Sequence, residues 1–213
     1  MITQEALVGQ IVAALLAGDG SGRAFTAKLG VSNRHVHLSR ADLDALFGPG
    51  YELTQTKALV QPGQYAAEET VTVAGPKGAL QKVRILGPVR PSSQVELLRS
   101  DAFVLGVDLP VRDSGCMDPS PSVTLVGPRG SVALGRGVMA AWRHLHLSED
   151  EARAHGLRDG DQVRVRAGGD RAVLFENVKV RAGRSHACEV HLDVDEANSA
   201  CLRNGDMVEI LPV

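Results

Sequence analysis

The sequence predicts a mainly β protein with short α-helices, built from small closed β-barrels that helices cap. The first observation is a series of short β-rich runs, separated by Gly, Pro and Asp, that begins after residue 26 and is typical of barrels and sandwiches. The second is an internal repeat in which a strand ending in His leads into a short helix. The runs read "ETVTVAG", "QKVRILG", "AFVLGVDLPV", "SVTLVG", "QVRVRAG", "VLFENVKVRAG" and "MVEILPV".

Two four-residue turns separate strands in the first part of the chain. They read "GPKG" at 75–78 and "GPRG" at 127–130. Proline presets one turn dihedral and glycine supplies a positive one, so each turn is expected to close a β-hairpin.

The repeat organises the second part of the chain. "HLSEDEARAHGLRDGDQVRV" starts at His146, and "HLDVDEANSACLRNGDMVEI" starts 45 residues later at His191. An earlier copy, "RHVHLSRADLDALFG", begins at residue 34 and shares the pattern Arg-His-x-His-Leu-Ser with residues 143–148. Each copy predicts a strand, a terminal His and a short helix, and in the last two a Gly-Asp turn starts the next strand.

The N-terminal segment differs from the rest. Residues 3–16, "TQEALVGQIVAALL", carry apolar residues at helical spacing after a Thr that can cap the helix, and "AGDGSGR" follows as a glycine-rich linker. Residues 1–22 are therefore expected to form an amphipathic helix and its tether, followed by barrel regions at 23–135 and 136–213 that are free to exchange strands. The helix packs either on its own domain or into a groove of another protein.

The composition excludes several classes of function. The chain of 213 residues has 44% hydrophobic residues, enough for a buried core, and 25 acidic against 23 basic residues. That balance provides no basic patch for nucleic acid. No apolar run approaches the roughly 18 residues needed to span a bilayer, and the first 20 residues lack the Lys or Arg of a signal peptide. Three cysteines without CxxC spacing favour a reducing, intracellular compartment.

The paired histidines predict a metal site. Residues i and i+2 of a strand face the same side, so His35 and His37 can present both imidazoles to one point, as can His144 and His146. Neutral imidazoles suit zinc, and His191 stands at the repeat position of His146 as a third ligand. The alternative is that each pair bonds only to backbone or solvent.

Other candidate residues are less specific. Arg90 lies in a Gly-Pro-x-Arg-Pro loop, where it is either a solvated charge or a guanidinium that grips phosphate bidentately. Taken alone, Glu96 reads as a carboxylate on a helix surface. His155 and His186 read as surface residues, and Cys188, near His191 in sequence, is a thiol able to approach a metal.

Several ordered motifs together carry a family resemblance. "VSNRHVHLS", "GPVRPSSQVELLRSDA", "PVRDSG", "TLVGPRGS", "RHLHLS" and "EVHLDVDEAN" resemble the PduL-type phosphate propanoyltransferases, the phosphotransacylases of bacterial microcompartments. The resemblance runs from about residue 25 to the C-terminus. The N-terminal helix and linker are similar to the encapsulation peptides of these enzymes, which implies packaging by shell or core proteins in the microcompartment lumen. Self-association into a homo-oligomer is also expected.

The resemblance implies two β-barrels with the active site between them, and two zinc ions per chain. His35 and His37 would hold one zinc, and the other would be held by Glu96, His144, His146 and His191. Arg90 would bind phosphate, and an acyl group would pass reversibly between coenzyme A, as a substrate, and phosphate. The acyl chain and the residues that contact coenzyme A stay open.

The residues also bear on mechanism. No Gly-x-Ser-x-Gly elbow and no Cys in a basic pocket is evident, so direct attack by phosphate is simpler than a covalent acyl-enzyme. Two other functions stay open. The helix-turn-strand unit resembles double-psi barrels, which serve as binding or structural modules, and a zinc-dependent hydrolase would use water as its nucleophile. Products formed with and without phosphate discriminate among the three.

Overall fold

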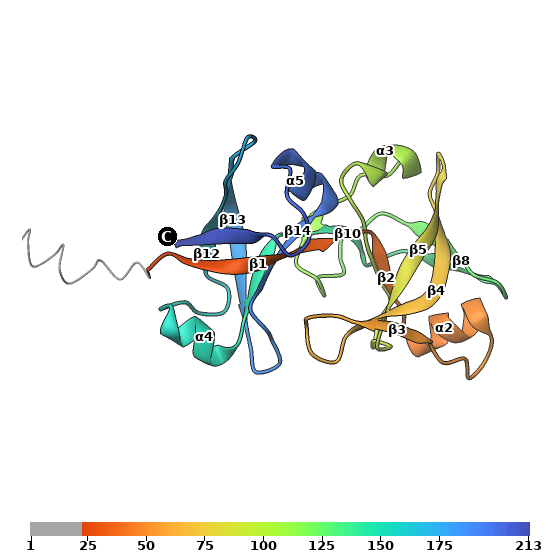
Figure 1. Ribbon diagram of the computed structural model, residues 1–213. Coiled ribbons are helices and arrows are strands. Elements are labelled where there is room, and N and C mark those ends of the chain that lie inside the picture. The colour runs from red at the N-terminus through yellow and green to blue at the C-terminus, as the bar shows by residue number, and fades with distance from the viewer. Residues whose placement is uncertain (1–22) are drawn as a thin grey trace, which may run out of the picture.

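The computed structural model describes residues 23–213, and the helix predicted at 3–16 lies outside them. The described chain is mostly β and has two parts side by side, a closed six-stranded barrel and a nine-stranded sheet that forms a half-barrel (Figure 1). This confirms the predicted fold class, although only one of the two sheets closes. Among the described residues, no helix has the length and hydropathy required to cross a membrane.

The barrel is formed mainly by the second half of the chain. Its strands run in the order β1, β14, β11, β13, β12, β15, and β1 closes it by pairing antiparallel with β15. Their apolar residues alternate inward, among them Leu29, Leu145, Val163, Val190 and Ile210, all at most 1% exposed. The strand bounds are β1 Phe25–Ser32, β11 His144–Leu147, β12 Gln162–Ala167, β13 Val173–Ala182, β14 Glu189–Asp193 and β15 Met207–Pro212.

The half-barrel sheet has the order β7, β10, β6, β2, β5, β4, β8, β9, and β3 adds to β4. One of its faces covers a second core, which includes Val36, Ile85, Val95 and Leu125. The bounds are β2 His35–His37, β3 Gln55–Ala58, β4 Tyr65–Ala74, β5 Ala79–Gly87, β6 Gln94–Glu96, β7 Val111–Arg112, β8 Val123–Val126, β9 Ser131–Leu134 and β10 Val138–Ala141.

Two strands cross the predicted division at residue 135. β1 precedes the whole half-barrel sheet in sequence but pairs with β14 and β15 of the barrel. β10 follows residue 135 but pairs with β6 and β7 of the sheet. The chain therefore passes between the two parts at residues 33–34 and again at 142–143, close to each pair of histidines.

Three helices begin directly after the histidine strands, as the repeat predicts. They are α2 (Arg40–Phe47), α4 (Glu149–Ala154) and α5 (Val194–Ser199). Ser39, Ser148 and Asp193 are their N-caps, each accepting from the backbone N–H three residues later. Each cap lies two residues after the last histidine of its strand, so the cap fixes where the strand ends.

The two predicted hairpins form, but their glycines are not needed for a positive φ. The Gly75 and Gly127 N–H groups bond to the Gly78 and Gly130 carbonyls at 2.9 Å, and none of the four has a positive φ. Each turn packs on the end of a helix instead. A Cβ on Gly127 would lie 2.6 Å from the Leu46 carbonyl oxygen of α2, so close approach excludes a side chain.

One predicted β-rich run is wrong. The first four residues of "AFVLGVDLPV" lie in α3 (Asp101–Leu105), and only its last residue is in a strand, as the start of β7 (Val111–Arg112). Both the N–H and the hydroxyl of Ser100 donate to the Asp195 carboxylate of α5, at 2.9 and 2.8 Å, which favours a helix start. Gly106 ends the helix in the left-handed conformation. These contacts come from distant sequence and override local propensity.

Candidate active site

The strand alternation that builds the two cores sends the histidines to the opposite faces. In β11, Leu145 and Leu147 point into the barrel, so His144 and His146 project from its outer surface. In β2, Val36 enters the core of the half-barrel sheet, so His35 and His37 project from the other face. Both faces border the same space between the two parts.

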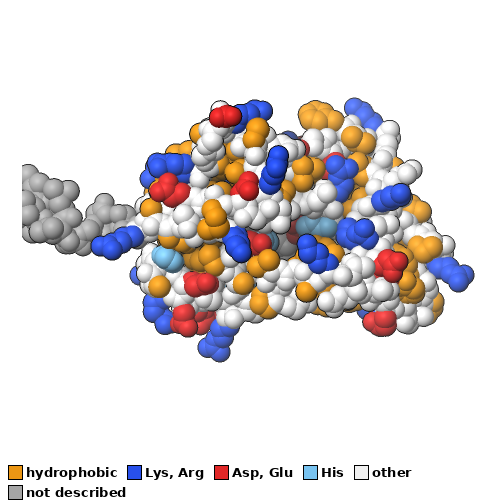
Figure 2. All heavy atoms as spheres, in the orientation of Figure 1, with side chains coloured by type: hydrophobic (Ala, Val, Ile, Leu, Met, Phe, Trp, Pro, Cys, Tyr) orange, Lys and Arg blue, Asp and Glu red, His pale blue; other side chains and the backbone are white. Residues whose placement is uncertain are grey.

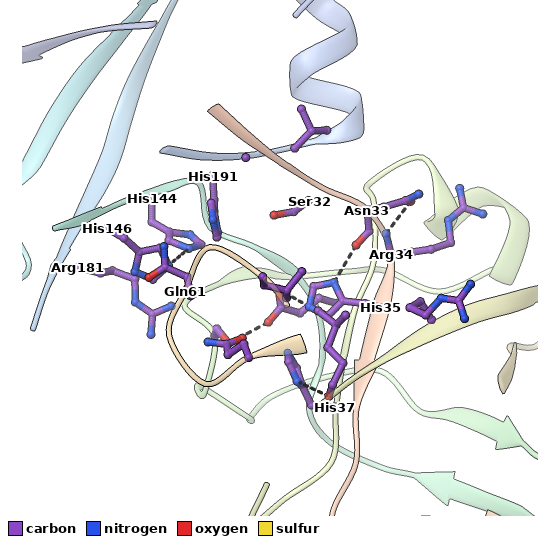
Figure 3. A pocket seen from close by; sticks show the side chains of 18 of the residues that line it. Ser32, Asn33, Arg34, His35, His37, Gln61, His144, His146, Arg181 and His191 are labelled. Atoms are coloured by element: carbon purple, nitrogen blue, oxygen red, sulfur yellow. Dashed lines mark hydrogen bonds and ion pairs between the residues drawn. The ribbon is translucent and has the colours of Figure 1, made fainter. Parts of the chain in front are cut away.

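This space is a cavity of about 470 Å³ lined by residues of both parts. It contains all seven site residues expected from the sequence: His35, His37, Arg90, Glu96, His144, His146 and His191. Histidine and basic side chains are exposed in the middle of the face shown in Figure 2. In close-up, His144, His146 and His191 lie on one side of the cavity and His35 and His37 on the other (Figure 3).

The first ligand group consists of His35, His37 and Glu96, whose potential ligand atoms lie within 4.8 Å of one another. His35 Nε2 is 3.5 Å from Glu96 Oε2. The resemblance implied that Glu96 joins the other three histidines, but antiparallel pairing of β2 with β6 makes Glu96 the register partner of His35. Glu96 is not on a helix surface: it is 9% exposed, on a strand.

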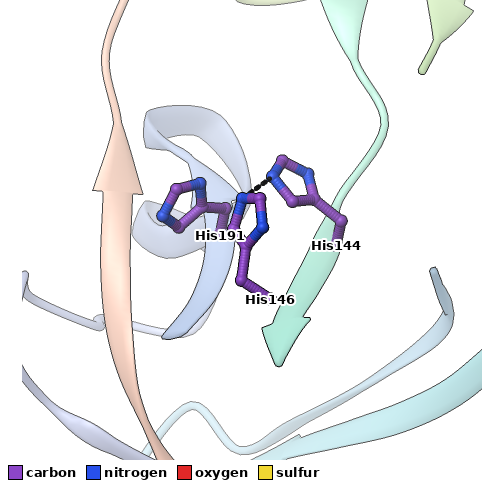
Figure 4. A group of neighbouring side chains, drawn as sticks. All are labelled: His144, His146 and His191. Atoms are coloured by element: carbon purple, nitrogen blue, oxygen red, sulfur yellow. Dashed lines mark hydrogen bonds between the residues drawn. The ribbon is translucent and has the colours of Figure 1, made fainter. Parts of the chain in front are cut away.

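The second group consists of His144, His146 and His191, also within 4.8 Å of one another. β11 and β14 pair antiparallel with His144 opposite His191, which brings the third ring beside the pair. His144 Nε2 lies 3.1 Å from His146 Nε2, and the three rings converge in Figure 4. Two histidines that are 47 residues apart in the sequence are thus direct neighbours across the sheet.

Burial keeps the imidazoles of His37, His144 and His146 neutral. It is the largest cause that lowers the pKa of His37 to about 3, followed by the charges of His35 and Arg90. Burial and then His191 lower the pKa of His144 to about 3. The pKa of His146 falls to about 2 through burial and the neighbouring His144 and His191. Neutral imidazole is the form that binds a metal.

Glu96 stays ionised despite its burial. Burial alone would raise the pKa of Glu96, but His35, His37 and a hydrogen bond from Ser114 at 2.8 Å outweigh it and lower that pKa. The charge of Glu96 also tends to raise the pKa of His144, a residue of the second group. The carboxylate therefore acts on both groups.

The chemistry of the donor set fits zinc. His144 and His35 donate from Nδ1 to the carbonyls of Trp142 and Asn33, at 2.7 and 2.8 Å, which leaves each Nε2 with a free lone pair. Two tetrahedral zinc ligands at about 2.0–2.1 Å from the ion lie about 3.3 Å apart, close to the observed 3.1 Å between His144 Nε2 and His146 Nε2.

Cys188 belongs to neither ligand group. Burial raises the pKa of its thiol, and the side chain packs beside the barrel core.

Arg90 is held at the entrance to the first group. Its N–H donates to the carbonyl of Leu38 at 2.9 Å, which ties the Gly-Pro-x-Arg-Pro loop to the end of β2. Within residues 23–213 its guanidinium forms no ion pair. Burial lowers the pKa of Arg90, Glu96 opposes that shift and Arg181 adds to it. This guanidinium is available to an anion in the cavity.

The residues of the cavity that escaped the sequence reasoning include Arg181, Ser114, Gln61 and His186. Arg181 is the register partner of His146 in the parallel β11–β13 pair, so it projects from the same face. The alternation in "VKVRA" shows that it points away from the core, but not which strand lies beside it. His186, expected on the surface, has its ring centroid 4.6 Å from that of His146.

Comparisons with known proteins identify the family of this chain. A family model described as phosphate propanoyltransferase matches residues 28–203. The chain belongs to the phosphate propanoyltransferase family. It is therefore a transferase of the family that exchanges acyl groups between coenzyme A and phosphate. The matched range contains every residue of both ligand groups, together with Arg90 and Arg181.

Similar phosphate propanoyltransferases come from several bacteria. The protein of Rhodopseudomonas palustris is 52% identical over 178 residues, which cover 84% of this chain and 79% of its own. That of Thermotoga maritima is 53% identical over 164 residues, covering 76% and 78%. That of Salmonella typhimurium is 49% identical over 164 residues, with the same coverage. The similarity therefore spans both parts of the fold.

Proposed function

We propose that this phosphate propanoyltransferase is zinc-dependent, holds two zinc ions per chain, and reversibly transfers a short acyl group, propanoyl or acetyl, between coenzyme A and phosphate. The observation that carries the proposal is the convergence on one cavity of two ligand groups and the guanidinium groups of Arg90 and Arg181, which form no ion pair within the described chain. His35, His37 and Glu96 would hold one ion, and His144, His146 and His191 the other, with Glu96 between them. A binding module has no need for this arrangement.

The arginines determine where phosphate binds. Arg90 and Arg181 both line the cavity and are close enough for the charge of Arg181 to lower the pKa of Arg90. Two neighbouring cations that have no carboxylate partner within residues 23–213 favour a multiply charged anion between them. Arg90, whose backbone is fixed to β2, orients phosphate beside the first ligand group.

The reaction follows as direct attack. A phosphate oxygen bonds to the thioester carbonyl carbon, the C–S bond breaks with its electron pair going to sulfur, and acyl phosphate and the coenzyme A thiolate separate. When bound, zinc supplies Lewis-acid polarisation of the carbonyl and a soft partner for the thiolate. The arginines balance the phosphate charge and align it for attack. The cavity offers no cysteine in place of phosphate, because Cys188 does not line it.

The proposal is tested on the purified full-length chain. Metal content is measured first, and thiol release is then followed with acetyl-, propanoyl- and butanoyl-CoA, each with and without phosphate. We expect about two zinc ions per chain and release that depends on phosphate and yields acyl phosphate. Equal release without phosphate would identify a hydrolase, and no release with any substrate would leave only a binding function.

Packaging is a second part of the proposal. We infer that residues 1–22 direct the enzyme to the lumen of a bacterial microcompartment by binding a shell or core protein. The support is that residues within 30–191 of the described chain line the cavity and include both ligand groups, Arg90 and Arg181. A homo-oligomer is also proposed, since Phe103 on α3 leaves an aromatic side chain exposed, with 86% of the residue accessible.

A further inference from the structure

We propose that Glu189 is a positioning residue for His191, fixing the ring so that Nδ1, and not Nε2, is the nitrogen offered to the metal. Glu189 belongs to neither ligand group, and the sequence reasoning did not select it. The inference rests on the proposed zinc function and names how one ligand of the second group is held.

The first observation is the contact between the two side chains. Glu189 and His191 are residues i and i+2 of β14 and share the face that points away from the barrel core. His191 Nε2 lies 2.7 Å from Glu189 Oε2. A ring nitrogen that donates its proton to a carboxylate has no lone pair for a metal, so only Nδ1 remains free.

Three of the other four site histidines use the opposite arrangement. His35, His37 and His144 place Nδ1 against backbone carbonyls, at 2.8, 3.2 and 2.7 Å, and thereby free Nε2. The position of His191 across from His144 brings its ring close from the neighbouring strand. His191 differs from these three histidines because a carboxylate, that of Glu189, lies against its Nε2.

The second observation is the space that Gly30, on the neighbouring strand, leaves beside Glu189 and His191. Gly30 of β1 is the register partner of His191 in the parallel β1–β14 pair. A Cβ on Gly30 would lie 2.8 Å from Glu189 Cδ and 2.9 Å from His191 Cδ2. Because the φ of Gly30 is not positive, its backbone does not require glycine. The missing side chain therefore serves to make room for the carboxylate and the ring together.

The third observation is a contact from the other part of the fold. Gln61, between β3 and β4, is 5% exposed, and its side-chain amide donates to the Ala187 carbonyl at 3.0 Å. The same amide lies 3.5 Å from Glu189 Oε2, the oxygen that accepts from His191 (Figure 3 shows Gln61 beside the histidines). A buried carboxylate is stable only when its oxygens have such partners. The half-barrel sheet thus helps to hold Glu189 against His191.

The test uses zinc alone as the probe. Apparent zinc affinities of both sites are measured by competition with a chromogenic chelator in the wild type, Glu189→Ala, Glu189→Gln and a control, Glu176→Gln, at an exposed position of β13. Loss of such a partner weakens metal binding about 10- to 100-fold. We expect that loss at one site in Glu189→Ala and a smaller one in Glu189→Gln, whose amide oxygen still accepts. Wild-type affinity at both sites in a folded Glu189→Ala would overturn the proposal.

A second measurement determines directly which ring nitrogen of His191 is protonated. Long-range ¹H–¹⁵N spectra of histidine in metal-free protein should show His191 protonated at Nε2 in the wild type and Glu189→Gln, and zinc should then shift Nδ1. A zinc-induced shift at Nε2 would contradict the assignment even if Glu189→Ala failed to fold. If the wild type bound no zinc, the proposed zinc-dependent function would be wrong. The metal-free spectrum would still show whether His191 is protonated at Nε2, next to Glu189.

Discussion

Replacing Arg90 separates phosphate chemistry from metal binding. The guanidinium faces the cavity without an ion-pair partner among the described residues, and its backbone is fixed by the hydrogen bond to Leu38. Substitution by Ala should therefore remove a phosphate contact without disturbing the ligand groups. Two charge-assisted hydrogen bonds of about 1.5–2 kcal/mol each, the lower part of the usual range, set an expected loss of about 3–4 kcal/mol of transition-state stabilisation. That loss corresponds to roughly two to three powers of ten in rate.

The assay measures phosphate-dependent thiol release and metal content together. Arg90→Ala should keep about two zinc ions and lose rate by that factor, with a raised KM for phosphate. Arg90→Lys keeps the charge but not the bidentate geometry, so an intermediate rate is expected. Arg171→Ala, at an exposed position in the turn between β12 and β13, is the control and should behave as wild type. Unchanged kinetics in Arg90→Ala, or loss of zinc from it, would refute the reasoning.

Three further predictions concern the metal, the fold and the N-terminus. His144→Ala and His191→Ala should each lose one of two bound metals and nearly all activity, measured by metal analysis and thiol release; either variant retaining both would contradict the ligand assignment. Gly127→Ala should lower the free energy of unfolding by about 1–3 kcal/mol in urea titrations, because its Cβ would lie 2.6 Å from a carbonyl oxygen at the end of α2. A Cβ on Gly135 would have no atom within 4 Å, so Gly135→Ala should leave the free energy of unfolding nearly unchanged; an equal loss of this free energy in both variants would contradict the packing argument. Deletion of residues 1–20 should preserve specific activity and zinc content but abolish packaging and reduce oligomer size; an inactive or unfolded product would assign this segment to the core.

Local sequence determined the elements that carry the site. The alternation in "RHLHL" places both histidines on one face of a strand, and the Ser two residues later ends that strand by capping a helix. The Gly-Asp turns form for the same local reason: Gly160 and Gly205 both have positive φ. Such features depend on neighbours within a few residues, so the repeat was sufficient to predict them.

Pairing between strands that are distant in the sequence decided which side chains lie together in the site. Glu96 lies with His35 because β6 is the antiparallel neighbour of β2, and Arg181 lies beside His146 because β11 and β13 run parallel in that register. The first four residues of "AFVLGVDLPV" lie in a helix, and the Asp195 carboxylate, from α5, accepts hydrogen bonds from Ser100 at the start of that helix.

Long-range register is set by which apolar faces can be buried together, and that depends on the whole fold. The sequence alone determined that paired histidines on strands lie next to capped helices. Only the tertiary structure decided that two such pairs share one cavity, because β1 and β10 each join the sheet of the other part and bring the two outer faces together.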